Sequence, residues 1–179
     1  MRLFTGISLT YEVRRNIELL YQSLQSLAAI DWAPASNLHV TTKFIGEWPD
    51  ERLDELKAVL RGLSEQARRP VPLSIDGFGW FPTPHHPRHL FAAVRAPELA
   101  ELAAATDSAL AAIGLPVETK PYRPHLTLAR IKDPLVDLAP VKQFIAQLPS
   151  TDFGRMTATS FKLFESRSRT YTVLEDFPL

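Results

Sequence analysis

Residues 37–46 read NLHVTTKFIG, and residues 124–131 read PHLTLARI. Both stretches are rich in β-branched and apolar side chains, which is typical of strands with one buried face. Each contains a His-x-Thr tripeptide, His39-Val40-Thr41 and His125-Leu126-Thr127, and the second begins 86 residues after the first. Residues two positions apart in a strand share a face, so each histidine has a hydroxyl beside it while the residue between them points into the core.

The rest of the chain alternates short strands with amphipathic helices. Hairpin-like neighbours among these strands favour an antiparallel α+β fold over a doubly wound parallel sheet. Helices are expected over residues 10–27, 50–65, 98–113 and 140–148, and the further strands over residues 2–9, 71–80, 88–94, 153–164 and 171–174.

The two His-x-Thr strands divide the helices into two comparable sets, as in a duplicated chain. Antiparallel sheets related by a pseudo-twofold axis would turn both histidines into one central cleft, with one imidazole as acid and the other as base on either side of a bound group. The alternative is that both histidines are buried and hydrogen-bonded, with no chemical role.

Composition excludes several classes of protein. The 179 residues are 45% apolar, so residues 1–179 are expected to fold as a single domain with its own core. Lys and Arg number 20 and so do Asp and Glu, which excludes a protein that coats nucleic acid through its overall charge. The lack of cysteine excludes disulfides, thiolate zinc sites and a cysteine nucleophile. Without an apolar run of membrane-spanning length, a cytoplasmic protein with no membrane contact is expected.

The segments NLHVTTKFIGEWP and PYRPHLTLAR resemble the two signature segments of the 2H phosphoesterase superfamily, in particular its RNA 2′,3′-cyclic phosphodiesterases, the 2′-5′ RNA ligase-like family. The likeness extends to MRLFTGISLTYEVR, FGWFPTPHHPRHLF and YTVLEDFPL. It implies a bilobal α+β fold with two intimately packed lobes and helices on the outside. It also implies metal-free, cofactor-free hydrolysis of RNA 2′,3′-cyclic phosphate ends to 2′-phosphomonoesters, with reversible 2′-5′ ligation in some members. RNA ends or small cyclic nucleotides would be the substrates, with no obligatory protein partner.

By this resemblance, four residues occupy the conserved positions of the two family motifs: His39, Thr41, His125 and Thr127. Opening a cyclic phosphodiester requires a base for water and an acid for the departing ribose oxygen, placed in line across phosphorus. The threonine hydroxyls would hold the phosphoryl oxygens. Symmetry does not choose between the histidines; the 2′-phosphate product that the resemblance implies leads us to assign His39 as general acid and His125 as general base.

Residues next to the motifs are candidates for binding substrate. Lys43 shares the parity of His39, so it either leans into the cleft or is a solvated lysine at the end of the strand. Phe44 has the opposite parity and is expected in the core or at its rim unless it stacks a base. Arg130 has odd parity from His125, and only a bulge or twist would turn it inward, although the resemblance gives this position a role. Thr42 stands where the family pattern has an apolar residue, on the expected core face.

A second cluster, His85-His86-Pro87-Arg88-His89, contains three histidines but no nearby carboxylate. A metal site there would make the protein a metal-dependent hydrolase. An exposed loop is the commoner outcome, and beside the cleft its Arg88 and histidines could touch RNA phosphates. Trp80 and Phe81 could stack a base or pack in the core. A non-catalytic nucleotide- or RNA-binding module on the same fold is the remaining alternative, and turnover of a cyclic phosphate separates it from the enzyme.

Overall fold

The strands of the chain form one antiparallel sheet in the order β7-β4-β5-β6-β3-β1-β8-β9, with the short β2 paired to β6, in a computed structural model that describes residues 1–179. The strands are β1 (Arg2–Ser8), β2 (Asp31–Trp32), β3 (His39–Glu47), β4 (Val71–Phe81), β5 (His89–Arg95), β6 (His125–Arg130), β7 (Asp152–Ala158), β8 (Ser160–Arg167) and β9 (Thr170–Pro178). The helices are α1 (Tyr11–Leu24), α2 (Leu53–Gln66), α3 (Pro97–Ala111) and α4 (Ala139–Ala146), with 3-10 turns η1 (Ala35–Asn37) and η2 (Asp50–Arg52). The expected antiparallel α+β fold is confirmed.

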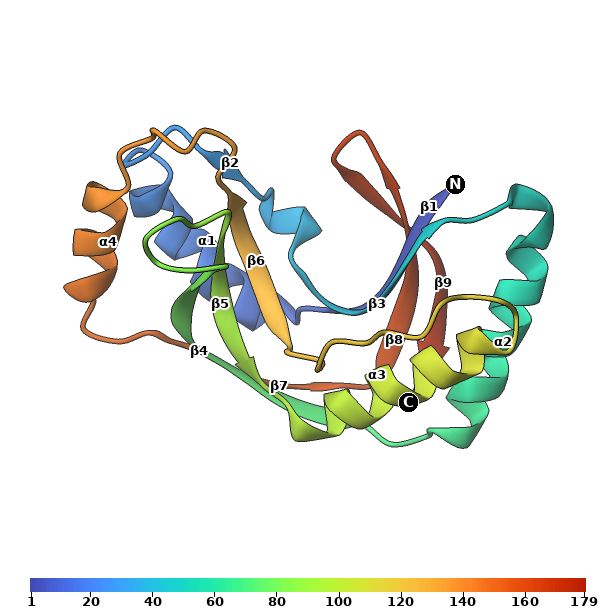
Figure 1. Cartoon of the computed structure of the whole chain (residues 1–179). Helices are drawn as coiled ribbons and strands as arrows, with labels where there is room; N and C mark the ends of the chain where they lie inside the picture. The colour runs from blue at the N-terminus through green and yellow to red at the C-terminus, as the bar shows by residue number, and fades with distance from the viewer.

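The sheet has two halves that meet between β3 and β6. The His39 half consists of β3, β1, β8 and β9, and the His125 half consists of β6, β5, β4 and β7. The halves are joined by one pair, Val40 opposite Leu126, so the two expected sheets are one continuous sheet. In Figure 1 the halves diverge from this junction like the arms of a V, and the helices lie outside them. No helix combines the length and the apolar composition needed to cross a bilayer.

Each half repeats the unit strand–helix–strand, as β1-α1-β3 and as β5-α3-β6. The helix of the first unit packs against β7 in the opposite half, whereas α3 packs against β3. The two repeats are therefore interlocked. Residues 153–164 were expected as one strand, and that expectation is wrong: β7 ends one half and β8 begins in the other, because the chain crosses between halves at Thr159.

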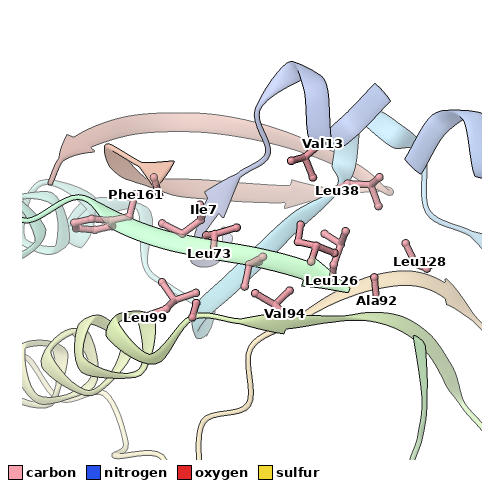
Figure 2. Packing of buried hydrophobic residues seen from close by; sticks show 14 of the residues in the cluster. Ile7, Val13, Leu38, Leu73, Ala92, Val94, Leu99, Leu126, Leu128 and Phe161 are labelled. Carbon is pink, nitrogen blue, oxygen red and sulfur yellow. The ribbon is translucent and has the colours of Figure 1, made fainter. Parts of the chain in front are cut away.

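The hydrophobic core lies between the sheet and its helices. Val40 and Leu126 are completely buried at the junction. Figure 2 shows Leu126 among buried side chains from both halves, including Ile7, Val94 and Leu128. Burying an aliphatic side chain of this size stabilises a fold by about 1.5–3 kcal/mol. The junction is thus a well-packed contact. The opposite face of the sheet, on the inside of the V in Figure 1, carries no helix and is here called the open face.

Each of the two central strands contains a β-bulge at the same place. In β3, Thr5 lies opposite Lys43 and Gly6 opposite Thr41, so Thr42 is the extra residue. In β6, Leu90 lies opposite Ala129 and Phe91 opposite Thr127, so Leu128 is the extra residue. A bulge interrupts the alternation of side chains, because two consecutive residues then face the same side. The residues that follow the bulge change face relative to the histidine, in β3 as far as Phe44, after which a second irregularity occurs at Ile45.

The bulges overturn two of the predictions made from parity. Lys43 does not reach the open face: it is buried on the helix side, in an ion pair with Asp107 of α3. Its ammonium also donates to the Pro116 carbonyl at 3.1 Å. Phe44 is not in the core; it is 69% exposed and shares the open face with His39.

Arg130 and Thr42, the other two positions next to the motifs, lie on the faces that the sequence analysis allowed for them. The bulge at Leu128 places Arg130 opposite His89 on the open face, which is the condition that the sequence required for a role in the site. Thr42 does face the core, where its hydroxyl is 2.7 Å from that of Thr5. A buried hydroxyl pair therefore replaces the apolar contact that the family pattern would place there.

The Thr5–Thr42 pair gives a stability prediction. Thr42→Val leaves the Thr5 hydroxyl buried without a partner, so we expect the free energy of unfolding to fall by about 1–3 kcal/mol. The double variant Thr5→Val/Thr42→Val removes both polar groups and should lose less than the sum of the two single variants. Urea unfolding of the four proteins measures this; strictly additive losses would contradict the pairing.

Candidate active site

The junction of the two halves brings the His-x-Thr motifs together. In the antiparallel register set by Val40 and Leu126, His39 lies on the Thr127 side and His125 on the Thr41 side. Since the paired residues point into the core, the histidines and threonines that flank them point to the open face. Each imidazole therefore has a hydroxyl from its own strand and one from the neighbouring strand nearby.

Both imidazoles are held in the same way. Nδ1 of His39 is 2.6 Å from the Asn37 carbonyl, and Nδ1 of His125 is 2.8 Å from the Arg123 carbonyl. A carbonyl oxygen only accepts, so Nδ1 carries the hydrogen in each ring, and Nε2 is left to gain or lose a proton. Nε2 of His39 lies 3.0 Å from Oγ1 of Thr41, whose hydroxyl donates to the neutral ring.

The environment of His39 favours its neutral form. Burial lowers the pKa of His39 below its usual value, and the nearby positive charges of His125 and Arg130 lower it further, while the Asn37 carbonyl opposes them. A bound phosphodiester anion would act in the opposite direction, since an adjacent negative charge stabilises the imidazolium. His39 is therefore able to take up a proton when an anion binds beside it.

Aromatic side chains surround His39. The ring of Phe4 lies 4.6 Å from the imidazole between centroids, and those of Tyr171 and Phe164 lie at 5.2 Å and 5.8 Å. Gly6, opposite Thr41, allows the strands to come this close, because a Cβ there would lie 2.8 Å from the Val40 carbonyl oxygen. The His39 half thus presents an apolar surface around its catalytic candidate.

The His125 half carries a different set of neighbours. Phe91 lies opposite Thr127, with its ring 5.7 Å from that of His125, and it fills the space over Gly79. His89 lies opposite Arg130 on the same face. Burial, together with the charges of Arg130 and His125, lowers the pKa of His89. The sequence placed His89 beside the cleft only as part of the 85–89 cluster and gave Phe91 no role, because no local pattern shows which residues of β5 lie opposite Thr127 and Arg130.

The two halves are therefore equivalent in position but not in chemistry. Phe4 pairs with Phe44 in the His39 half at the place where His89 pairs with Arg130 in the His125 half, each pair just beyond its bulge. An aromatic pair thus faces one side of the motifs, and a polar pair that contains the cation Arg130 faces the other. The symmetry that left the orientation of a substrate undecided in the sequence is broken here.

The remaining candidates lie farther from the motifs. His85 and His86 are exposed in the loop between β4 and β5, and no three His, Cys, Asp or Glu side chains converge anywhere in the chain as ligands for one metal ion. The loop histidines thus give the metal-site alternative no geometric support. Phe81 is exposed beside His89, with ring centroids 6.3 Å apart, whereas Trp80 is half-buried beneath Lys142.

Tyr122 supports the site from the segment that precedes β6. Its hydroxyl donates to the Thr41 carbonyl at 2.7 Å, and burial raises the pKa of this tyrosine well above its usual value. The bond ties the Arg123–His125 approach to the bulged part of β3. Nothing in the sequence pattern distinguished Tyr122 from an ordinary core residue.

Comparison with known proteins identifies the family. The model of the LigT-like phosphoesterases matches residues 7–91 and again residues 92–174, so the chain belongs to this family and contains its motif twice. The chain is 31% identical to an RNA 2′,3′-cyclic phosphodiesterase of Thermus thermophilus over 100% of this chain and 90% of that protein. It is 29% identical to one of Archaeoglobus fulgidus over 93% and 91%.

Solved structures share the fold. A crystal structure of a Thermus thermophilus protein has a TM-score of 0.80 at 31% identity, covering 100% of this chain and 98% of that chain. The Escherichia coli protein LigT in complex with 3′-AMP has a TM-score of 0.75 at 26% identity, covering 99% and 97%. The antiparallel fold expected from the sequence is that of these phosphoesterases.

The charges around His39 give a prediction for NMR. Arg130→Gln removes a positive charge that disfavours the imidazolium, so the pKa of both His39 and His89 should rise. Titration of the imidazole resonances measures this, with Arg95→Gln, at the far end of β5, as the charge-matched control. Unchanged histidine titrations in Arg130→Gln would show that Arg130 does not face them.

Proposed function

We propose that this protein hydrolyses RNA 2′,3′-cyclic phosphate ends to 2′-phosphomonoesters without a metal ion. The observation that carries the proposal is the pair of imidazoles on adjacent antiparallel strands, each with Nδ1 bonded to a carbonyl and Nε2 available on the open face. The name shared by the Thermus thermophilus and Archaeoglobus fulgidus relatives supports the same reaction. The interlocked halves also support treating residues 1–179 as a single domain.

In the proposed mechanism His125 is the general base. Its Nε2 takes a proton from water as the water oxygen attacks phosphorus, in line with the bond from phosphorus to the ribose 3′ oxygen. That bond breaks, and the 3′ oxygen receives the proton held by Nε2 of His39. The 2′ oxygen keeps the phosphate. His39 begins the step protonated and His125 ends it protonated, so the proton count balances.

The proposed acid role of His39 accounts for its surroundings. Burial keeps the free imidazole neutral, with its Nε2 bonded to Thr41; the bound phosphodiester anion raises its pKa so that it becomes protonated in the complex. The Thr41 hydroxyl is then released from Nε2, and with that of Thr127 it can donate to the phosphoryl oxygens. Arg130 supplies the positive charge that a metal ion would otherwise bring to the developing charge.

Replacement of either histidine tests the two-histidine site. His39→Ala and His125→Ala should each lower turnover of a 2′,3′-cyclic phosphate-ended oligonucleotide by about two to four powers of ten. Turnover by the unaltered protein should be insensitive to EDTA, and chromatography should identify a 2′-phosphate product that resists a 3′-specific phosphatase. Thermal unfolding of the variants controls for folding. Near-normal turnover by both variants contradicts the proposal and favours a non-catalytic binding module or a different site.

A sulfur substitution tests which histidine is the acid. In a substrate with sulfur in place of the bridging 3′ oxygen, the leaving group departs as a thiolate. A thiolate is far less basic than an alkoxide, so its departure depends much less on a proton from the general acid. It should restore much of the turnover of His39→Ala and little of that of His125→Ala. The rescued rate should rise with pH, because it depends only on neutral His125. Rescue of His125→Ala but not of His39→Ala, with a rate that rises with pH because neutral His39 would then be the base, would exchange the two roles.

A further inference from the structure

A basic hollow lies just beyond the end of the His125 half. It is lined by residues 85–88, by the segment that follows β6, and by Lys142 of α4. Three cationic side chains, Arg88, Lys132 and Lys142, line it together with one carboxylate, that of Asp137. In a chain whose formal charge is zero, this is a local excess of positive charge. It has no part in the two-histidine mechanism.

Most of this charge is not neutralised within the protein. Lys142 donates to the Pro84 carbonyl at 2.8 Å and lies over the Trp80 ring, without a carboxylate partner. The Arg88 guanidinium likewise makes no ion pair, and Oδ1 of Asp137 is engaged by the Ala139 amide at 2.9 Å. Exposed cations that hold no acidic partner are available to an external anion.

Lys132 is the only cation of the hollow with a carboxylate, and it shares that carboxylate. Its ammonium is 3.0 Å from Asp31, which also pairs with Arg169 of the β8–β9 turn. Two positive charges on one carboxylate leave an excess of one. The pairing therefore reduces the positive charge at this rim without cancelling it.

The hollow adjoins the ends of β5 and β6, next to strand residues that lie on the open face. The Arg88 carbonyl accepts from the Ile131 amide at 2.8 Å, and the next residues inward on the two strands are His89 and Arg130, which lie opposite each other. Phe81, exposed at the same edge, offers a ring on which a base could stack. The cation Arg130 thus lies between the His-x-Thr motifs and the residues that line the hollow, and the Phe81 ring lies beside its neighbour His89.

The other half offers no such path. The equivalent place in the His39 half carries Phe4 and Phe44, and the strands then end with Arg2 opposite Glu47, a pair with no net charge. A strand of RNA whose cyclic end sits between the histidines would meet the exposed Phe44 ring on one side and Arg130 on the other. Its phosphates are the part that cations attract.

We propose that the basic hollow binds backbone phosphates of the RNA strand on the 5′ side of the cyclic end, with Arg88 and Lys142 as the main contacts. The inference rests on the proposed function, because it takes the cyclic end to lie between His39 and His125. The guanidinium and the ammonium donate to phosphate oxygens without reading the base, so the hollow favours an RNA end over a cyclic mononucleotide and is indifferent to sequence.

The test compares Arg88→Gln/Lys142→Gln with Arg69→Gln/Arg95→Gln, which removes two exposed positive charges elsewhere. The first variant should lower kcat/KM for an oligonucleotide of about ten residues with a cyclic phosphate end by roughly three- to tenfold, and leave a 2′,3′-cyclic mononucleotide unaffected. Removing two phosphate contacts should also reduce the slope of log affinity against log salt by about 1.4 for single-stranded RNA. The Arg69/Arg95 variant should behave like the unaltered protein.

A second readout separates this inference from the proposed function. Fluorescence anisotropy measures binding of the same oligonucleotide ending in a 3′-hydroxyl, which requires no turnover. Weaker binding with a reduced salt slope in the Arg88/Lys142 variant alone supports the hollow as an RNA site, even if cyclic phosphates are not hydrolysed. Equal affinities and equal salt slopes in all three proteins would overturn the inference. An equal loss of affinity in both variants would also overturn it, because it would show that RNA responds only to the overall charge of the protein.

Discussion

The pairing of β3 with β6 at Val40 and Leu126 is the contact on which the candidate site depends. Each half of the sheet supplies one imidazole and one hydroxyl, so neither half contains both an acid and a base. Complete burial of the paired side chains fixes the register, and a shift by one residue would turn every motif side chain to the wrong face. The interlocked packing of α1 on β7 and α3 on β3 holds the halves in that relation.

The repeated bulge gives the duplicated strands different chemistry. Thr42 and Leu128 occupy the same position after their histidines, and each turns the residue two places later onto the open face. In one strand that residue is Phe44, and in the other it is Arg130. A duplicated chain thus gains an apolar side and a cationic side through substitution at equivalent positions. A nucleotide with a 2′,3′-cyclic phosphate has an aromatic base and an anionic phosphodiester group. It would bind such a surface in one orientation more readily than in the other.

The sequence predicted the antiparallel fold from hairpin-like neighbouring strands. It placed each histidine beside its threonine because alternation with a period of two holds from His39 to Thr41 and from His125 to Thr127. It failed beyond Thr41, where the bulge contains no glycine or proline to announce it, so Lys43 and Phe44 were assigned to the wrong faces. The ion pair of Lys43 with Asp107 joins residues far apart in the chain, which local pattern cannot reveal. The pairing of His89 with Arg130 depends on which strands are neighbours, and the crossing at Thr159 lies within a stretch that has strand-like composition on both sides.

The central claim is that the two halves act as one site, and the double variant His39→Ala/His125→Ala tests it most directly. Acid and base that act in the same step are not independent, so removing the second costs little once the first is gone. Turnover of a cyclic phosphate-ended oligonucleotide by the double variant should therefore stay within about tenfold of the slower single variant. A loss equal to the product of the two single losses would mean that the histidines act independently, and would contradict the account.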